Sequence, residues 1–278
     1  MLLLTFAIGA ASHGSQRWIS IGPFSLQPSE LAKIGIILFL AAYISSKSRE
    51  MRQWKKMVIP FLFAIPIIVI VGIENLSTCI ILLAISFIMI FVATPLLVPF
   101  VVIGLIGVAG AGGLLLTQGY RMERITVWLD PAASEKGHQT IQGLYAIGSG
   151  GLFGKGLGQS MQKLGFLPEA NNDMIFSVIC EELGLFGALC VLALFFALIW
   201  RFMVIAVNAP DLYGSMIVVG VIAHIGIQVF INIAVATNTI PNTGIPLPFI
   251  SYGGSSLVFM LLEMGLVLSV SRYINVKK

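Results

Sequence analysis

Charged side chains are scarce in this sequence. Asp, Glu, Lys and Arg make up only 10% of the 278 residues, whereas apolar residues make up 58%. Soluble domains carry about 25% charged residues, so the composition excludes a soluble globular protein. The alternating polarity that membrane β-barrel strands require over about 10 residues is also missing. These absences leave an all-α, polytopic transmembrane helical bundle as the predicted fold class.

Cysteines and nucleotide-binding motifs are sparse as well. The three cysteines, Cys79, Cys180 and Cys190, lie in apolar stretches without metal-ligand spacing, so we interpret them as small buried residues. No basic face interleaved with aromatic residues is present, which argues against nucleic-acid binding. The glycine-rich stretch 148–160 lacks the Walker spacing, and we expect no organic cofactor.

About eight apolar segments could cross a membrane as helices, although the first is short. A spanning helix needs about 20 residues for a hydrocarbon core about 30 Å thick. No internal repeat or linker is detectable, so residues 1–278 are interpreted as a single domain. No basic residue precedes the first apolar segment, which disfavours a signal peptide. The predicted spans are residues 1–12, 29–45, 57–74, 76–93, 97–117, 174–200, 214–236 and 255–272.

Lysine and arginine are concentrated on one side of this topology. Residues 46–56 hold five basic residues, and the C-terminal tail adds Arg272, Lys277 and Lys278. Basic loops remain in the cytoplasm, so the alternate loops are predicted to face outward. The long outward loop is expected to carry function, because long loops in compact proteins are uncommon. The outward segments are residues 13–28, 118–173 and 237–254.

The first candidate motif is FLPEANNDMIFSVICEELG, residues 166–184. It places Asp173 at the start of a long apolar helix, at the outer edge of the membrane. The positive end of the helix dipole keeps a carboxylate ionised and attracts anionic phosphates. Asn171, Asn172 or Asp173 could equally serve as the helix N-cap, and capping is compatible with catalysis.

Glu181 and Glu182 are predicted to lie about two turns deeper in the same helix. Ionisable groups inside a span are costly and often mark functional sites. At 100° per residue, Glu181 lies about 80° around the helix from Asp173 and could share a cavity with it. The alternative, which we favour for both glutamates, is a structural ion pair with a basic residue of another helix.

A second motif, GSQRWISIGPFSLQPSELAK, covers residues 14–33. Glu30 and Lys33 are three residues apart and therefore lie on one helical face. A lysine one turn inside a span must extend to the interface, form an ion pair, or contact an anionic ligand. A structural Glu30–Lys33 pair and a ligand contact are both open.

The third motif, YRMERITVWLDP, covers residues 120–131. Its Arg121 and Arg124 lie one turn apart just outside a span. Two such guanidinium groups suit a phosphate, although arginines at helix ends often only anchor the helix at the interface.

The fourth motif is NTGIPLPFISYGGSS, residues 242–256, which contains Ser251 and Ser255. Its proline and glycine content predicts irregular backbone. Near a membrane such backbone is tolerated only when it is buried in protein or lines a cavity. A structural loop and the wall of a substrate groove are both open interpretations.

These four motifs, in this order, resemble the SEDS family of bacterial membrane proteins (RodA, FtsW and SpoVE), over essentially the whole chain. The resemblance implies a peptidoglycan glycosyltransferase of the bacterial cytoplasmic membrane with its active face outside. Such enzymes polymerise lipid II into glycan strands and release undecaprenyl pyrophosphate. The implied partners are a class B penicillin-binding transpeptidase and other divisome or elongasome membrane proteins.

The resemblance also implies roles for individual residues. Asp173 matches the aspartate of the family motif PE-x-x-x-D-F-I-F. It is therefore the implied catalytic residue, either as general base toward the acceptor 4-hydroxyl or as ligand of a divalent cation (Mg or Mn). The implied substrate and pyrophosphate contacts are Arg121, Arg124, Lys33 and Glu30, and the implied supporting residues are Glu169, Glu181, Ser251 and Ser255.

The sequence also departs from the family pattern. The family usually has ten spans, so the N-terminus is expected to be shortened. Asn75 stands where the family's P-D-[LF]-[GS]-T run has an aspartate, and Asn172 and Met174 replace the commoner Thr and Phe beside Asp173. The segments around Leu157 and Leu167 favour the FtsW and SpoVE branch, while a role in division, elongation or sporulation stays open.

Two other classes of function compete with a glycosyltransferase. A lipid II flippase would also contain intramembrane acids such as Glu181, Glu182 and Glu263, together with proline-broken helices. The absence of an inverted repeat and the outward clustering of polar residues argue against it. A non-catalytic scaffold of the wall-synthesis complex is the second alternative.

Overall fold

The computed structural model describes residues 10–12, 15–21, 24–94, 104, 119–134 and 137–274. The chain divides into two compact units, and each is described by itself. Unit 1 comprises Met1–Phe100, Ile199–Ile227 and Gly253–Lys278, and unit 2 comprises Val101–Leu198 and Gln228–Tyr252. The interpretation of the chain as one functional domain stays a prediction.

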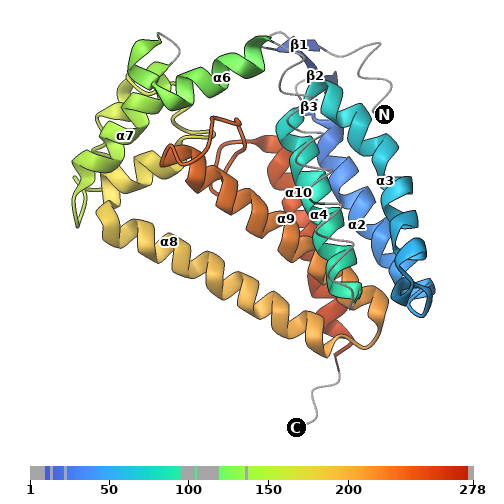
Figure 1. The fold of residues 1–278 in the computed structure, drawn as a ribbon. Helices are drawn as coiled ribbons and strands as arrows, with labels where there is room; N and C mark the ends of the chain where they lie inside the picture. Colours follow the sequence, from blue (N-terminus) through green and yellow to red (C-terminus); the bar gives the residue numbers. More distant parts are fainter. Residues whose placement is uncertain are drawn as a thin grey trace. The chain divides into compact units, whose positions relative to one another are not determined.

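Six helices in the described part of the chain are long and apolar enough to cross a membrane. The predicted all-α membrane class is confirmed, and each of these helices matches a predicted span to within a few residues, apart from the longer C-terminal end of α8. They are α2 (Pro28–Ser46), α3 (Trp54–Glu74), α4 (Leu76–Ala93), α8 (Ile175–Asn208), α9 (Leu212–Ala236) and α10 (Gly254–Arg272), labelled in Figure 1.

Two further predicted spans fall largely outside the described residues. Of the span 97–117 only Gly104 is described. Of the span 1–12 only Ala10–Ser12 are described, and they form strand β1 rather than the end of a helix.

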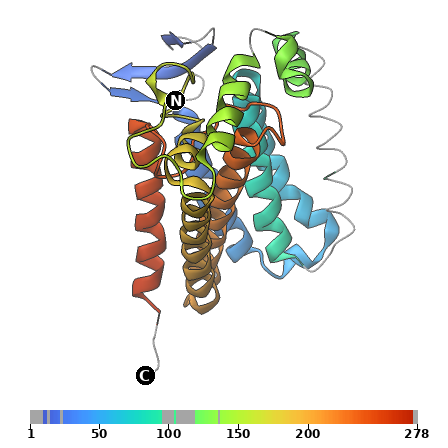
Figure 2. The same cartoon turned by 90° about the vertical axis from the view of Figure 1, so that its left-hand side faces the viewer.

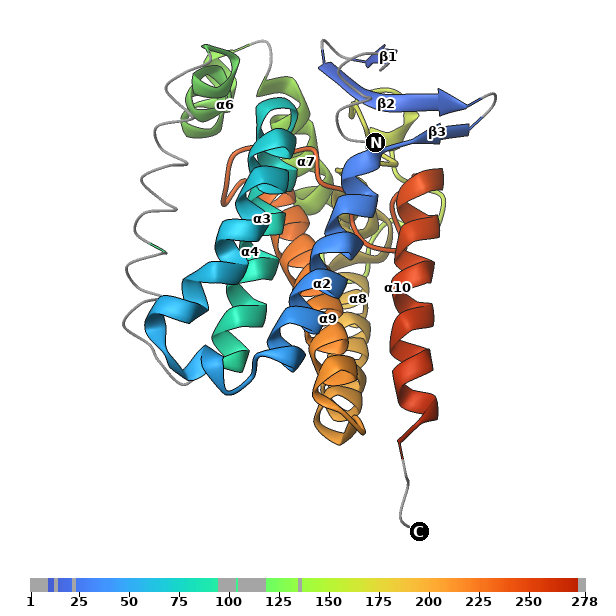
Figure 3. The ribbon, with the colours of Figure 1, turned by 90° about the vertical axis from the view of Figure 1, so that its right-hand side faces the viewer.

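A small antiparallel sheet precedes α2 and was not predicted. It consists of β1, β2 (Ser15–Ile21) and β3 (Phe24–Leu26), in the order β1-β2-β3. Trp18 lies opposite Ala10, and Ile19 lies opposite Leu26. The aromatic and β-branched residues of SQRWISI favour a strand, and seven residues are too few for a span. Figure 2 and Figure 3 show the sheet beside the N-terminal end of α2.

The helices of unit 1 pack through fully buried aliphatic side chains. Ile37 and Leu40 of α2 and Ile85 and Met89 of α4 have no exposed surface. Helices α2, α3 and α4 lie side by side, and α10 lies beside α2 (Figure 3). Large apolar side chains such as Phe63 remain exposed on the outer face of α3, as a lipid-facing surface requires.

The described residues of the predicted outward loop 118–173 form helices and ordered turns in unit 2. It contains α6 (Gly119–Leu129) and α7 (His138–Gly150), followed by glycine-rich turns that lead to α8. The irregular segment between α9 and α10 also belongs largely to this unit. Unit 2 therefore holds three of the four motifs almost completely.

Candidate active site around Asp173

Asp173 lies two residues before the first residue of α8, and the residue is only 7% exposed. Its carboxylate accepts hydrogen bonds from Gln139 Nε2, at 3.3 Å to Oδ1 and 3.5 Å to Oδ2. The pKa of Asp173 is raised from its ordinary 3.8 to about 6, mainly by burial and to a smaller extent by the negative charge of Glu169. A hydrogen bond from its own backbone N–H, the bonds from Gln139 and the charge of Arg124 partly oppose this shift in pKa.

A chain of hydrogen bonds leads from Arg124 to this carboxylate. Arg124 Nη1 donates to the main-chain carbonyl of Asn242 at 2.8 Å. The side-chain Nδ2 of Asn242 donates to Gln139 Oε1 at 3.1 Å, and Gln139 in turn donates to Asp173. Arg124 is exposed and has further N–H groups that can reach an anionic ligand. Residues from the third and fourth motifs thus converge on the aspartate of the first.

The backbone that carries Asp173 is bound to the segment between α9 and α10. Asn232 of α9 is fully buried and donates from Nδ2 to the carbonyls of Asp173, at 2.7 Å, and Ile245, at 2.8 Å. Ser251 Oγ donates to the carbonyl of Asn172 at 2.6 Å, and it accepts from the N–H of Leu247 at 2.7 Å. Ser251 therefore supports the site by fixing the residue next to Asp173, as expected for a supporting residue.

Glu169 has an unusual backbone conformation for a non-glycine residue. Its φ of 54° lies in the left-handed region, and the same is true of Phe249 at 63°. Strained conformations of this kind persist where the surrounding structure holds them, and they cluster at functional sites. The side chain of Asn172 donates to the Glu169 carboxylate. Glu169 is thus held where its charge disfavours ionisation of Asp173.

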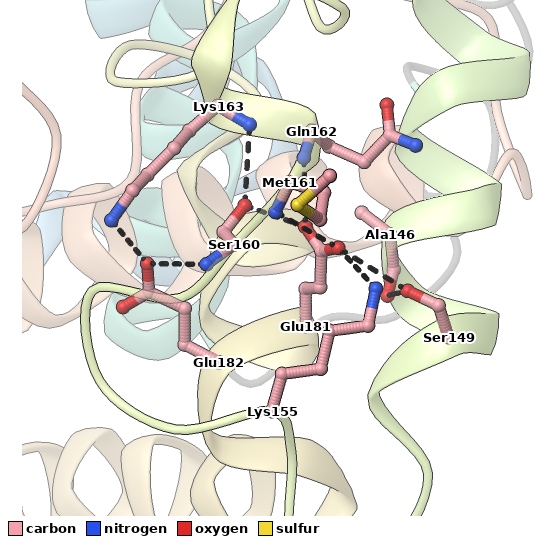
Figure 4. Close-up of polar contacts among 9 residues, drawn as sticks. All are labelled: Ala146, Ser149, Lys155, Ser160, Met161, Gln162, Lys163, Glu181 and Glu182. Atoms are coloured by element: carbon pink, nitrogen blue, oxygen red, sulfur yellow. Dashed lines mark hydrogen bonds and ion pairs between the residues drawn. The ribbon is translucent and has the colours of Figure 1, made fainter.

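Glu181 binds the glycine-rich segment instead of contributing to the Asp173 network. Its carboxylate forms an ion pair with Lys155 Nζ at 2.6 Å and accepts from Ser160 Oγ at 2.5 Å (Figure 4). Further donors are Ser149 Oγ and the backbone N–H groups of Met161 and Gln162. The ion-pair alternative for Glu181 therefore describes the structure, although the lysine comes from a loop and not from another helix.

Glu182 binds the same segment from the adjacent position. It pairs with Lys163 Nζ at 2.6 Å and accepts from the backbone N–H of Ser160 at 3.4 Å (Figure 4). It also accepts from the backbone N–H of Gly158 at 2.9 Å. The two neighbouring carboxylates together hold residues 155–163 against the first part of α8.

Helix α8 is interrupted just after these glutamates. Gly184 adopts φ 67° and ψ −167°, which no helical residue has. The backbone of the glycine-rich segment supplies partners at the break: Leu185 N donates to Gly151 O at 2.9 Å, and Phe186 N donates to Leu152 O at 3.0 Å. The uninterrupted apolar helix therefore begins after Gly184. Glu181 and Glu182 lie about two turns after Asp173 in the first part of α8, as predicted, and precede the break.

Glu30 and Lys33 form the predicted ion pair in the first turns of α2. The Nζ–Oε1 distance is 2.8 Å, and the Lys33 side chain is 2% exposed. Glu30 Oε2 is buried and has no hydrogen-bond partner among the described residues. Both residues belong to unit 1, whereas Asp173 belongs to unit 2. Their implied contact with the substrate stays a prediction.

Two other implied residues are only partly defined by the structure. Arg121 belongs to α6, but its side chain lies outside the described part. Ser255 is half-buried in the first turn of α10, in unit 1. Their roles stay predictions.

Glu263, the third intramembrane acid, is paired with a histidine. Both oxygens of its carboxylate lie 2.9 Å from His224 Nδ1, and both residues are buried within unit 1. Each lies near the middle of its own helix, α9 or α10. Each of these two polar side chains, which lie in apolar helices, is therefore the hydrogen-bond partner of the other.

The described residues contain no group of three or more His, Cys, Asp or Glu side chains that could hold a metal ion. Near Asp173 the other acidic group is Glu169, which is bonded to Asn172. The residues of the site thus do not form a complete protein-derived set of metal ligands, and we derive no step through a metal.

Three residues of the site were not found by sequence analysis. Asn232 could have been found, because His224, Gln228 and Asn232 recur every four residues in an otherwise apolar span, and all three are buried. A polar stripe of this kind must find partners inside the protein. Gln139 has no such signal, because it lies among other polar residues outside the predicted spans. Asn242 begins the fourth motif, but nothing in the sequence separates it from its polar neighbours.

Known proteins resemble the chain over nearly its full length. The family model of the cell cycle proteins FtsW, RodA and SpoVE matches residues 1–276. Stage V sporulation protein E of Bacillus subtilis (strain 168) is 47% identical over 279 residues, covering 98% of this chain and 76% of that protein. A probable peptidoglycan glycosyltransferase FtsW of Geobacter sp. (strain M18) is 37% identical, with coverages of 98% and 76%.

Solved structures give the same result. A chain from a peptidoglycan synthase complex that coordinates polymerization and crosslinking matches with a TM-score of 0.79 and 28% identity, covering 99% of this chain and 79% of that chain. The rod shape determining protein RodA of Thermus thermophilus matches with a TM-score of 0.69 and 29% identity, with coverages of 99% and 76%. This chain therefore belongs to the FtsW/RodA/SpoVE family of membrane proteins.

Proposed function

We propose that this protein is a peptidoglycan glycosyltransferase that polymerises lipid II, with Asp173 as its general base. The observation that carries the proposal is the setting of Asp173. Its carboxylate is buried, its pKa is raised to about 6, and it is connected through Gln139 and Asn242 to Arg124. Relatives named as peptidoglycan glycosyltransferases support the assignment of the reaction.

The reaction forms one bond and breaks another at the anomeric carbon of the donor. The 4-hydroxyl oxygen of the acceptor sugar attacks this carbon while its bond to the pyrophosphate oxygen breaks. Undecaprenyl pyrophosphate leaves with the electron pair. The proton of the hydroxyl passes to the Asp173 carboxylate, which later releases it to solvent.

The raised pKa of Asp173 suits this role. A carboxylate with an ordinary pKa of about 4 is a weak base at neutral pH. At a pKa of about 6, Asp173 is mostly ionised at neutral pH and is still a stronger base than an exposed aspartate. General-base catalysis is most effective when the pKa lies near the working pH.

Arg124 is suited to neutralise the leaving group. One of its N–H groups is bound to the Asn242 carbonyl, which fixes the direction of the guanidinium. The remaining N–H groups are donors for a phosphate oxygen, and a guanidinium stays charged at every physiological pH. Arg121, one turn earlier in α6, is proposed to contribute further positive charge.

We further propose that the site faces the outside of the cytoplasmic membrane and works beside a class B penicillin-binding transpeptidase. The basic loop 46–56 supports this orientation, because such loops remain in the cytoplasm. The structural relative from a peptidoglycan synthase complex supports the partnership. The flippase alternative is weakened, because the three acids that would line a transport path are each paired with a basic residue of the protein. They are Glu181, Glu182 and Glu263.

The proposal is tested by the product made in reconstituted vesicles that contain labelled lipid II. A glycosyltransferase lengthens the lipid-linked sugar, whereas a flippase exposes it without lengthening. We expect polymer from the wild type with its transpeptidase, and none from Asp173→Ala. Translocation without polymer would contradict the proposal. Parallel reactions with EDTA, followed by added Mg or Mn, test whether Asp173 acts with a divalent cation.

A further inference from the structure

The side-chain amide of Gln139 has a fixed orientation. The series of hydrogen bonds that sets this orientation starts at the backbone N–H of Gly244, which donates to Asn242 Oδ1 at 3.0 Å. A backbone N–H can only donate, so the other end of the Asn242 amide must be its Nδ2 donor. This donor faces Gln139 Oε1 at 3.1 Å. The Nε2 of Gln139 is therefore the group that faces Asp173.

The backbone at both ends of this series of hydrogen bonds, at Asn242 and at Asp173, is held in place as well. Arg124 holds the main-chain carbonyl of Asn242, and Asn232 holds the carbonyls of Asp173 and Ile245. The amide of Gln139 thus lies between two segments whose positions are determined by other residues. A movement of either segment would lengthen the hydrogen bonds that Gln139 forms with Asn242 and Asp173.

We propose that Gln139 is a positioning residue of the glycosyl transfer, whose locked amide donates to Asp173 and holds the carboxylate ready to accept the proton. This inference rests on the proposed function of Asp173. Gln139 does not need to touch the sugar, because it acts through the carboxylate.

A neutral donor at this place has a specific advantage. A cation beside the carboxylate would stabilise its charge strongly and make it a poorer base. An apolar side chain would leave a buried carboxylate without this donor, and the acid would then stay protonated to a higher pH. The amide lies between these extremes, since it orients both oxygens and adds no charge.

The first experiment measures the titration of Asp173 directly, without substrate. The protein is reconstituted in lipid nanodiscs, and the carboxylic-acid C=O band is followed by infrared spectroscopy as a function of pH. The spectrum of Asp173→Asn is subtracted to isolate this residue. We expect Gln139→Glu to move the titration to higher pH through like-charge repulsion, and Gln139→Lys to move it to lower pH through attraction.

The second experiment measures the pH dependence of lipid II polymerisation with the same variants. Gln139→Leu is expected to be about tenfold slower than the wild type at about pH 5, but nearly equal at about pH 8, because it loses a hydrogen bond to a charged group. Asn242→Asp keeps the acceptor for Gly244 but loses the donor to Gln139, so its acidic limb should also move to higher pH.

Gln162→Leu is the matched control for these variants. It makes the same chemical change in unit 2, at a side chain whose Oε1 has no hydrogen-bond partner in the described part of the chain. Its pH profile is expected to equal that of the wild type. Thermal unfolding of each variant shows whether the fold is retained.

The possible outcomes separate the inference from the proposed function. Opposite shifts for Gln139→Glu and Gln139→Lys show that residue 139 acts electrostatically on Asp173. A loss in Gln139→Leu that is confined to low pH, with none in Gln162→Leu, supports the positioning role, because a purely structural defect would lower activity equally at every pH. An unshifted titration of Asp173 in all Gln139 variants would overturn the inference. If Asp173→Asn polymerised lipid II normally, the proposed function would fail, whereas the infrared titration would still report the coupling between Gln139 and Asp173.

Discussion

Asn232 donates from its Nδ2 to the main-chain carbonyl of Asp173 at 2.7 Å and also to that of Ile245 at 2.8 Å. One fully buried amide in α9 thus ties the segment before α8 to the irregular segment after α9. The two segments that form the site are far apart in sequence, and this residue fixes their spacing.

Replacement of Asn232 by Leu should therefore affect both stability and activity. Two buried carbonyls would lose a donor, at a cost of about 1–3 kcal/mol each, so we expect the free energy of unfolding to fall by about 2–6 kcal/mol. Gln228→Leu, one turn earlier, removes one bond to Pro246 O and should cost about half as much. Denaturant unfolding measures both, and equal losses would contradict the account.

Asp173 is expected to reduce stability at neutral pH. Its pKa is higher in the folded protein, about 6, than its ordinary value of 3.8. A group with a raised pKa stabilises the fold below its unfolded pKa, and this contribution is lost as the pH rises through the folded pKa. Asp173→Asn should thus raise the stability at about pH 7.5 by up to about 3 kcal/mol, and give no gain at about pH 4.

This stability prediction is checked by thermal unfolding of the wild type and Asp173→Asn at both pH values. A gain that is the same at both would show that ionisation of Asp173 is not its cause. A loss of stability at neutral pH would show that the carboxylate is better stabilised than its burial indicates.

Glu169 is predicted to adjust the working pH of the enzyme. Its negative charge raises the pKa of Asp173, so Glu169→Gln should lower that pKa. Because the ionised form is the base, the acidic limb of the polymerisation rate should move to lower pH. Glu123→Gln, in α6, serves as a control for the removal of one negative charge elsewhere in unit 2. A shift to higher pH in Glu169→Gln would be inconsistent with the predicted sign.

Gly184 is predicted to be intolerant of any side chain. It has a positive φ of 67°, and a Cβ atom there would lie 2.4 Å from the backbone nitrogen of Gly154. Gly184→Ala should therefore separate the glycine-rich segment from α8 and lower the unfolding temperature. Gly148 is helical and has open space around it, so Gly148→Ala should be neutral or stabilising by up to about 1 kcal/mol. Equal unfolding temperatures for the two variants would refute the prediction.

The membrane helices could be predicted closely from the sequence, because apolar length alone determines them. The observed bounds of α4, Leu76–Ala93, equal the predicted range 76–93. The Glu30–Lys33 pair was also predictable, since residues three apart on a helix face the same side. Strand β2 was missed because seven residues beside a predicted span carry too weak a pattern to compete with hydropathy.

The site itself could be predicted only in part. The motif around Asp173 identified the carboxylate, but Gln139 and Asn242 reach it from segments 34 residues before and 69 residues after it in the sequence. Such pairings depend on tertiary packing, which local patterns do not encode. The partners of Glu181 were not predictable for a similar reason, because Lys155 and Ser160 belong to a loop that only tertiary packing brings to α8.

The most direct test of the account is the rate of lipid II polymerisation by Asp173→Asn, which changes one oxygen of the carboxylate to nitrogen. The variant should still fold and bind the lipid, but general-base catalysis is worth about 10²–10⁴-fold, so we expect its rate to fall at least about a hundredfold at about pH 7.5. A rate equal to that of the wild type, in the same reconstituted vesicles, would contradict the role of Asp173.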